Sequence, residues 1–282
     1  MKKWLLVSGI LLSAITLFIW MNNKWLEVSS YSISSPDIPK TFDGARVVQI
    51  SDLHNTVFGK NHSALLNKTK FIDPDVILIT GDIVDSSRYD LNVMISLTES
   101  LLEIAPVYFV TGNQEFLKGR AEKTISAIKA SGVIVLENEM VEWKREGEKI
   151  YIAGIHDPLV ERSTLVKKYV KKALADIQFT EKFTLLLAHR PELVVVYAET
   201  EADIVFSGHA HGGQIRIPKI GGIFAPGQGF FPELTEGVHE FGNTLLVISR
   251  GLGNSSFPLR INNRPEIVVV ILEHGKQAEG TN

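Results

Sequence analysis

The chain has 282 residues, of which 45% are hydrophobic and 22% are charged, and its formal net charge is −3. This length allows one or two domains, and the absence of a basic block argues against a nucleic-acid-binding surface. The chain contains no cysteine, which excludes disulfide bonds, thiolate metal ligands, a cysteine nucleophile and lipidation on cysteine.

An uncharged apolar stretch, Trp4 to Met21, follows two lysines at the start of the chain. As a helix it just suffices to cross a hydrocarbon core of about 30 Å, and it has no polar face. We therefore expect residues 1–21 to be an uncleaved membrane anchor; a cleaved signal peptide is the alternative, although no small-residue cleavage site follows. Because only Lys24 closely follows the stretch, we expect the N-terminus in the cytoplasm and the rest of the chain on the extracytoplasmic side of the cell membrane.

Residues 22–41 are serine-rich, and we expect a linker there, either a connector or an edge strand. Short apolar runs then alternate with amphipathic segments, which favours an α/β fold with a strand-rich second half. The predicted helices are Ser63–Phe71, Leu91–Leu102, Ala121–Ala130 and Thr164–Ala175. The predicted strands of the second half are Ile150–Ile155, Leu185–Leu187, Ile204–Phe206, Thr244–Ile248 and Ile267–Leu272. We expect one folded domain over residues 42–275 and a tail over residues 276–282.

Five polar motifs, spread over about 160 residues, each follow a run that is typical of a buried strand. They are Asp52-Leu53-His54, Gly81-Asp82, Gly112-Asn113, His189 and Gly208-His209-Ala210-His211. Residues at the carboxyl ends of neighbouring strands converge, and carboxylate, imidazole and amide groups together are the ligands that two adjacent metal ions need. We expect Asp52 and His54 to point the same way from an extended strand end.

Each motif alone has a simpler interpretation, and only their combination favours a metal site. A lone Asp-x-His is usually a polar turn, and Asp82 is a candidate N-cap for a helix that begins at Ile83. Asn113 fits a turn, and a lone His189 fits a buried core position.

The five motifs resemble the signature of the calcineurin-like metallophosphoesterases, which runs D-x-H, G-D-x-x-D, G-N-H-[ED], H and G-H-x-H. The resemblance covers roughly residues 42–273, and three tracts are similar to the bacterial membrane-associated or exported branch. They are Gly208–Arg216, Phe224–Pro226 and Ser249–Gly253. The resemblance implies a four-layer α/β/β/α sandwich of two mixed sheets, here preceded by one transmembrane helix.

The resemblance also implies a dinuclear metal site and a phosphoesterase activity. One metal would be bound by Asp52, His54, Asp82 and His211, and the other by Asp82, Asn113, His189 and His209. Nitrogen and oxygen ligands without sulfur suit Mn²⁺, Fe, Zn²⁺, Co²⁺ or Ni²⁺. The expected reaction is hydrolysis of a phosphodiester or pyrophosphate bond by in-line attack of a hydroxide that bridges the metals. Asp82, Asn113 and Gln114 are the expected catalytic residues.

One position departs from the family signature, because Gln114 replaces the histidine that usually follows the asparagine. The family histidine is thought to protonate the leaving oxygen or to steady the transition state. An amide donates a hydrogen bond but cannot release a proton as a general acid. Arg190 and Arg250 are the candidates for binding the anionic group of the substrate.

Two other functions remain open on the sequence alone. One is a pyrophosphatase that acts on a lipid or nucleotide-sugar intermediate, and the other is a non-catalytic metal-binding protein of the cell envelope. We expect a monomer whose partners are the membrane and a phosphate-ester or pyrophosphate substrate.

Overall fold

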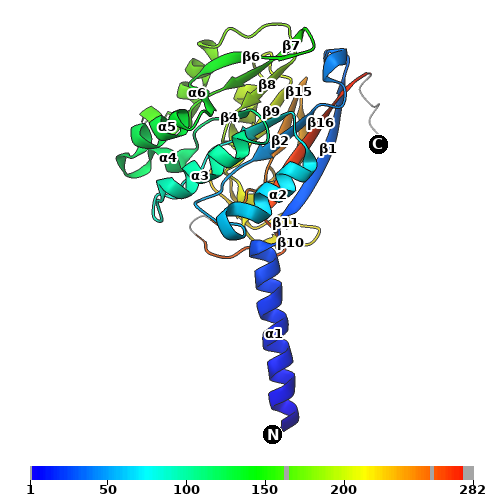
Figure 1. Ribbon diagram of the computed structural model, residues 1–282, viewed down its shortest axis with the longest axis vertical. Coiled ribbons are helices and arrows are strands. Elements are labelled where there is room, and N and C mark those ends of the chain that lie inside the picture. The colour runs from blue at the N-terminus through cyan, green and yellow to red at the C-terminus, as the bar shows by residue number, and fades with distance from the viewer. Residues whose placement is uncertain (1, 162–164, 255–256, 276–282) are drawn as a thin grey trace.

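The computed structural model describes residues 2–161, 165–254 and 257–275, in which one long helix projects from a layered domain (Figure 1). The α-helices are α1 (Lys2–Lys24), α2 (Ser63–Ile72), α3 (Leu91–Leu102), α4 (Asn113–Phe116), α5 (Ala121–Ala130), α6 (Val166–Ala175) and α7 (Val194–Tyr197). Short 3₁₀ helices are η1 (Lys40–Phe42), η2 (Lys60–His62), η3 (Leu117–Gly119), η4 (Pro158–Glu161), η5 (Pro191–Leu193) and η6 (His211–Gly213).

Two six-stranded sheets form the centre of the domain. The first has the order β1 (Glu27–Ser35), β16 (Glu266–His274), β2 (Arg46–Ile50), β3 (Val76–Ile79), β4 (Val107–Phe109) and β5 (Ile134–Val135). The second has the order β14 (Gly237–Phe241), β15 (Thr244–Ile248), β9 (Ile204–Ser207), β8 (Thr184–Leu187), β7 (Glu148–Gly154) and β6 (Glu139–Arg145). Two small hairpins pair β10 (Arg216–Ile217) with β11 (Gly221–Gly222) and β12 (Phe224–Ala225) with β13 (Gly229–Phe230).

Both sheets are mixed. Strands β2 to β5 run parallel, whereas β16 is antiparallel to β2 and parallel to β1. In the second sheet β7, β8, β9 and β15 run parallel, and β6 and β14 form antiparallel edges. Helical crossover connections cover both faces of the parallel strands that they join. These strands are therefore buried on both sides, which explains their continuous apolar sequences.

Alternation along each strand divides its side chains between two cores. In β16, Val268 and Val270 belong to the core between the two sheets, whereas Ile267 and Val269 belong to the core under α2, α3 and α5. A third core packs α6 and α7 against the outer face of the second sheet. The four-layer α/β/β/α sandwich expected from the sequence is therefore confirmed.

The predicted helices Leu91–Leu102 and Ala121–Ala130 are confirmed residue for residue. Helix α6 begins at Val166; Thr164, the predicted first residue, lies outside the described residues, as does the predicted tail 276–282. The segment 22–41 is not merely a linker, because it contributes β1, which pairs with β16 along its whole length. Of the two forms expected for this segment, the edge strand is the one observed.

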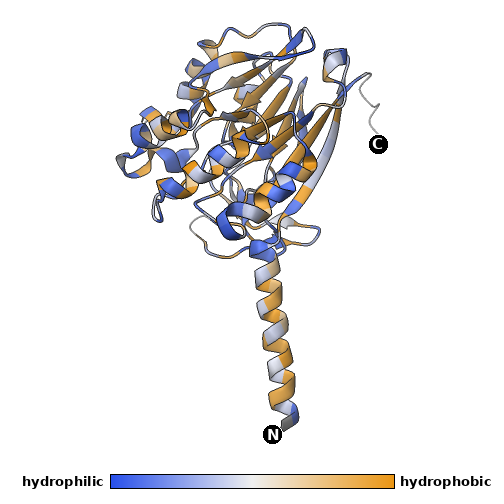
Figure 2. Cartoon of the chain, viewed as in Figure 1, coloured by the Kyte–Doolittle hydropathy of each residue, from blue (hydrophilic) through white to orange (hydrophobic). Residues whose placement is uncertain are grey.

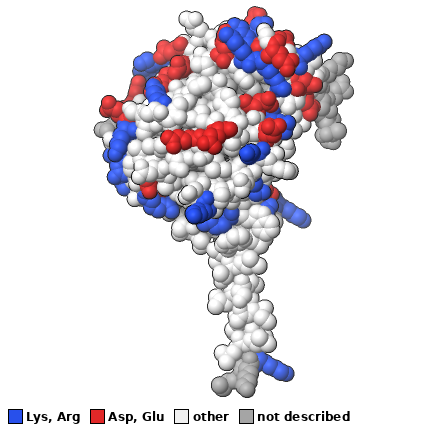
Figure 3. All heavy atoms as spheres, viewed as in Figure 1, with Lys and Arg blue, Asp and Glu red and all other residues white. Residues whose placement is uncertain are grey.

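Helix α1 is long and apolar enough to cross a membrane, with a mean hydropathy of 2.1 over its most apolar window. Its side chains from Lys3 to Trp20 are exposed, so it is not a core helix of the domain. Figure 2 shows the apolar character of α1, and Figure 3 shows that its surface carries no charge between its two ends.

Candidate metal centre

Two clusters of buried ligand atoms meet at the carboxyl ends of the central strands. The ligand atoms of Asp52, His54, Asp82 and His211 lie within 4.8 Å of one another, as do those of Asp82, His189 and His209. Asp82 belongs to both, and its Oδ2 lies 3.6 Å from His54 Nε2 and 3.5 Å from His189 Nε2. Residues of four of the five motifs therefore meet here, with one carboxylate shared between the two clusters.

The backbone that positions these side chains is not extended, contrary to the expectation for Asp52 and His54. Both residues follow the end of β2 in the left-handed region, with φ of 50° and 47°. Asp82, His209 and His211 have φ of 52°, 63° and 49°. Non-glycine residues seldom adopt this conformation, although aspartate and histidine do so more often than most. Sharp turns rather than strand alternation aim these side chains.

Glycine allows the loops of the two sheets to approach each other. A Cβ on Gly81, whose φ is +92°, would lie 2.8 Å from His189 Nδ1 and 2.7 Å from the Cα of Gly112. A Cβ on Gly208 would collide with the Ser51 hydroxyl and the Asp52 carboxylate. The glycines of the motifs thus have a packing role at the site.

Hydrogen bonds determine which histidine nitrogen faces the site. His189 Nδ1 donates to the Thr80 carbonyl at 2.7 Å, and a carbonyl can only accept. In the neutral ring, Nε2 is then the free acceptor, and it lies 3.1 Å from His209 Nδ1. His54 Nε2 and His211 Nε2 face each other at the same distance, 3.1 Å. At this distance one of the two nitrogens carries the proton of a hydrogen bond, and a metal ion bound here would replace that proton.

The histidines of the centre differ in protonation. Burial opposes ionisation, but the Asp82 carboxylate raises the pKa of His189 to about 10, and His189 lowers the pKa of Asp82. Burial and neighbouring cationic groups hold the pKa values of His209 and His211 well below their usual range, so both rings are neutral. Divalent metal ions bind neutral imidazole, and binding at His189 must displace its proton.

Orphaned polar atoms test whether the residues fit metal ions. Asn113 Oδ1 is buried without a hydrogen-bond partner among the described residues. Asn113 is the first residue of α4, directly after Gly112. The family signature implies that this side chain binds the second metal. A buried carbonyl oxygen without a donor is costly unless a ligand satisfies it, so the donor set fits two divalent cations.

The two loops that carry Asp82 and Asn113 are joined by Glu115, to which the sequence interpretation gave no role. Its buried carboxylate accepts the backbone N–H groups of Asp82, Ile83, Val84 and Gly112 at 2.7–3.3 Å. Burial and the nearby Asp82 raise the pKa of Glu115 to about 7, against the four N–H donors. The acidic fourth position of G-N-H-[ED] was the sequence signal for this residue.

Asp82 is not the helix N-cap of its simpler interpretation, and Gln114 contacts the same loop. No helix starts after Asp82; its Oδ1 accepts from the Gln114 backbone N–H at 2.7 Å, and α3 begins only at Leu91. The Gln114 side chain turns to the same loop, where its Oε1 accepts the backbone N–H of Ser86 at 3.0 Å. Gln114 therefore stabilises the loop after Asp82, and its amide nitrogen remains as a donor.

The two arginines expected to bind substrate are both engaged by carboxylates. Arg190 forms a bidentate pair with Asp157, at 2.6 and 3.0 Å. Arg250 lies 3.0 Å from both Glu27 and Glu266 and joins β1, β15 and β16 at the end of the first sheet. Paired arginines of this kind hold elements together, so the structure does not present them as free cations for a phosphate group.

Another arginine, Arg260, lies in the centre and was missed in the sequence because no motif surrounds it. Its side chain is fully buried, its Nη2 lies 3.3 Å from His211 Nδ1, and it donates to the carbonyls of Arg250 and Gly253. Burial lowers the pKa of Arg260 to about 10, which leaves it cationic at neutral pH. Two carboxylates, Asp85 and Glu192, flank the site at 3.8 Å from His54 Nδ1 and 3.9 Å from His209 Nε2.

A four-layer sandwich with two Asp/His clusters that share one carboxylate suits a dinuclear divalent metal centre. Comparison with known proteins agrees: the sequence profile described as calcineurin-like phosphoesterase matches residues 45–213. The chain belongs to this family, and it is a metallophosphoesterase, a hydrolase of phosphoric esters or anhydrides.

Relatives of known sequence cover nearly the whole chain. The uncharacterized metallophosphoesterase YkuE of Bacillus subtilis (strain 168) is 30% identical over 262 residues, 90% of this chain and 88% of that protein. An uncharacterized metallophosphoesterase of Campylobacter jejuni is 29% identical and covers 96% of this chain and 70% of its own. A transmembrane protein with a metallophosphoesterase domain from Danio rerio is 30% identical over 88% of this chain and 57% of its own.

Proposed function

We propose that the protein is a single-pass membrane phosphoesterase that hydrolyses phosphodiester or pyrophosphate bonds at a dinuclear metal site on the extracytoplasmic side. The observation that carries this proposal is the position of Asp82 Oδ2, about equally far from His54 and His189 at the junction of the two clusters. The apolar helix α1 and the transmembrane protein among the relatives support the membrane location.

The proposed ligands are those implied by the family signature, with Asp82 shared between the ions. Two divalent cations, whose identity stays open among Mn²⁺, Fe, Zn²⁺, Co²⁺ and Ni²⁺, would supply Lewis acidity and lower the pKa of water. The residues of the chain hold the donors in place. Glu115 binds the backbone of the Asp82 loop, and the Thr80 carbonyl accepts a hydrogen bond from His189 Nδ1. The Arg260 guanidinium contacts His211 Nδ1.

The proton that the leaving oxygen needs has no donor at position 114. Gln114 can stabilise developing negative charge with a hydrogen bond, but it cannot protonate the departing group. The proposed substrates therefore have leaving groups that are stable as anions, such as a phosphate monoester or a phenolate. This is the reason for proposing phosphodiester and pyrophosphate bonds rather than simple alkyl monoesters.

Chelation and reconstitution of the full-length protein test the proposal. Removal of metals should abolish hydrolysis of bis(4-nitrophenyl) phosphate, and Mn²⁺ or a similar ion should restore it, with two ions per chain by elemental analysis. Asp82→Ala should bind fewer than two ions and lose more activity than a change of any unshared ligand. Normal turnover by Asp82→Ala with two bound ions would contradict the assignment.

A further inference from the structure

The proposed metal centre lies at the end of the domain to which α1 is attached. Strand β1 begins at Glu27, three residues after the end of α1 at Lys24. Because β1 is parallel to β16 and β16 is antiparallel to β2, the carboxyl end of β2 lies at this same end of the sheet. Asp52 and His54 follow directly, so the strands place them at the end of the domain from which α1 projects (Figure 1).

Hydrogen bonds connect the last turn of α1 to the centre through single residues. Asn23 Oδ1 accepts the backbone N–H of Arg260 at 3.0 Å, and the Arg260 guanidinium contacts His211. In parallel, Asn22 Oδ1 accepts the backbone N–H of Asn263 at 3.2 Å, and the Asn263 amide donates to the His211 carbonyl at 2.8 Å. In each of these two connections, a single residue links the end of the candidate membrane span to His211 of the site.

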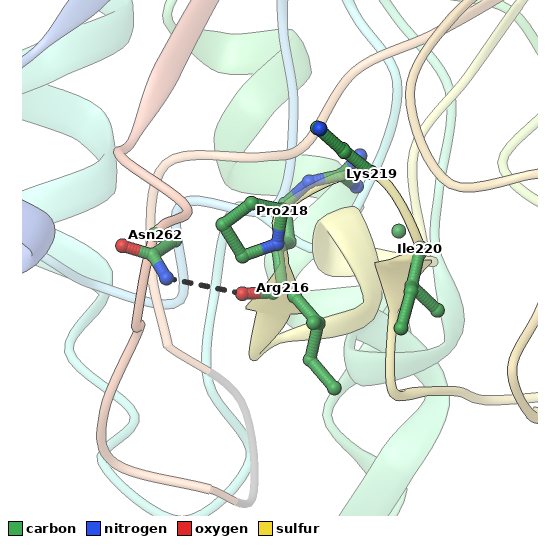
Figure 4. Close-up of a pocket in the computed structure, with 7 residues that line it drawn as sticks. Arg216, Pro218, Lys219, Ile220 and Asn262 are labelled. Carbon is green, nitrogen blue, oxygen red and sulfur yellow. Dashed lines mark hydrogen bonds between the residues drawn. The ribbon is translucent and has the colours of Figure 1, made fainter.

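Exposed apolar side chains surround this end of α1. We call them the membrane-proximal rim and define it as Trp25, the β10–β11 hairpin and the loop of residues 257–263. Trp25, Ile220 and Phe257 of the rim are 47%, 65% and 47% exposed. Asn262 donates to the Arg216 carbonyl at 3.2 Å and so fastens the hairpin to the loop (Figure 4).

The length of α1 would place the rim at the surface of a bilayer. Its 23 residues span about 35 Å as a helix, against a hydrocarbon core of about 30 Å. Tryptophan and lysine prefer the interface between membrane and water. Trp20, Lys24 and Trp25 lie where the helix would emerge from the hydrocarbon core. A cavity of about 680 Å³ beside them is mainly apolar, and Lys24 and Lys68 line it. Such a surface matches acyl chains below and anionic headgroups above.

We propose that the membrane-proximal rim rests on the bilayer and that the site takes its substrate from there, as the phosphodiester or pyrophosphate headgroup of a membrane amphiphile. This inference rests on the proposed function, since it names the substrate class of the same site. A lipid anchored in the leaflet presents its phosphate at the height of the rim, whereas a soluble ester gains nothing from the exposed apolar side chains.

The test uses full-length protein in lipid nanodiscs with three phosphodiesters that share a 4-nitrophenolate leaving group. They are the long-chain phosphatidyl ester embedded in the disc, its water-soluble dibutanoyl analogue and bis(4-nitrophenyl) phosphate. We expect faster turnover of the embedded ester than of the dibutanoyl ester. The double variant Ile220→Asp/Phe257→Asp should lower the ratio of embedded to dibutanoyl turnover about tenfold or more, because it removes two apolar contacts with the bilayer.

Phe71→Asp is the matched control, because Phe71 is 91% exposed on α2 at the far end of the first sheet, where Asp73 pairs with Arg46 at the start of β2. It should leave the ratio unchanged. Metal content and thermal unfolding confirm that the double variant is folded. Equal turnover of the two phosphatidyl esters, or an unchanged ratio in the folded double variant, would overturn the inference alone. Metal-loaded protein that hydrolyses none of the three esters would overturn the proposed function and the inference with it.

Discussion

At the scale of single residues, Glu115 explains how a site can be assembled from loops in an unfavourable backbone conformation. The left-handed turn at Asp82 is costly alone, and four N–H groups bound to one carboxylate offset that cost. The expected metal ligands can thus be read from the signature, whereas the residue that supports their loops is revealed by its contacts.

Replacing Glu115 by Gln should loosen the loops of Asp82 and Gly112. The amide offers one acceptor oxygen, so two buried backbone N–H groups face an NH₂ group and lose their acceptors at about 1–3 kcal/mol each. The midpoint of thermal unfolding of the full-length protein in detergent should fall by about 5–10 °C. Glu99→Gln, at an exposed position on α3, is the control and should change it little. A Glu115→Gln midpoint equal to that of the wild type would show that these bonds do not stabilise the loops.

Gln114 predicts how the rate depends on the leaving group. Without a general acid, rates should fall steeply as the pKa of the leaving group rises across a series of aryl and alkyl phosphodiesters. Gln114→His should rescue the poor leaving groups selectively and change the good ones little. A flat dependence in the native enzyme would mean that another residue supplies the proton.

At the scale of elements, β1 shows how a polar segment becomes part of a sheet. Its serines give a weak strand signal, but the strand pairs with β16 along its whole length, and its first residue, Glu27, pairs with two arginines. Glu27 lies 3.0 Å from Arg250 and 2.8 Å from Arg264. Burial opposes ionisation, but hydrogen bonds from Arg264 and the charge of Arg250 lower the pKa of Glu27.

Because the pKa of Glu27 is lower in the folded state, its contribution to stability is present above its ordinary value near 4.5 and is lost as the pH falls through the folded value. Glu27→Gln should therefore lower the unfolding midpoint at pH 7. The difference from the wild type should shrink when the same measurement is made below about pH 4.5. Glu240→Gln on β14, an exposed position, should show neither effect. A difference that is constant with pH would exclude the charge of Glu27 as the cause.

The elements that could be predicted from the sequence are those with a strong period or a buried run. Leu91–Leu102 and Ala121–Ala130 have apolar residues on one helical face, and the central strands are apolar on both faces. The site residues were brought together by short motifs at strand ends. The turns that aim Asp52 and His54, the engagement of Arg190 by Asp157, and the position of Arg260 depend on tertiary contacts that no local pattern records.

At the scale of the whole molecule, α1 joins the domain at one end, so the side of the membrane on which the domain lies can be measured with a protease. If the N-terminus is inside, protease added to intact spheroplasts should remove the domain and leave about the first two dozen residues with the membrane. Protection of the domain until the cells are lysed would reverse the orientation. A released form that starts near Asn22 would indicate a cleaved signal peptide instead.

The asparagines at the end of α1 have a practical consequence for anyone who purifies this enzyme. Membrane anchors are commonly cut off to obtain a soluble catalytic domain, and a cut before Glu27 would remove Asn22 and Asn23 together with their bonds to Asn263 and Arg260. The loop behind His211 would then lose its fixed partner on one side. Weak metal binding or low turnover in such a shortened preparation would report on the missing helix, and inhibitors selected against it would meet a differently shaped site in the cell.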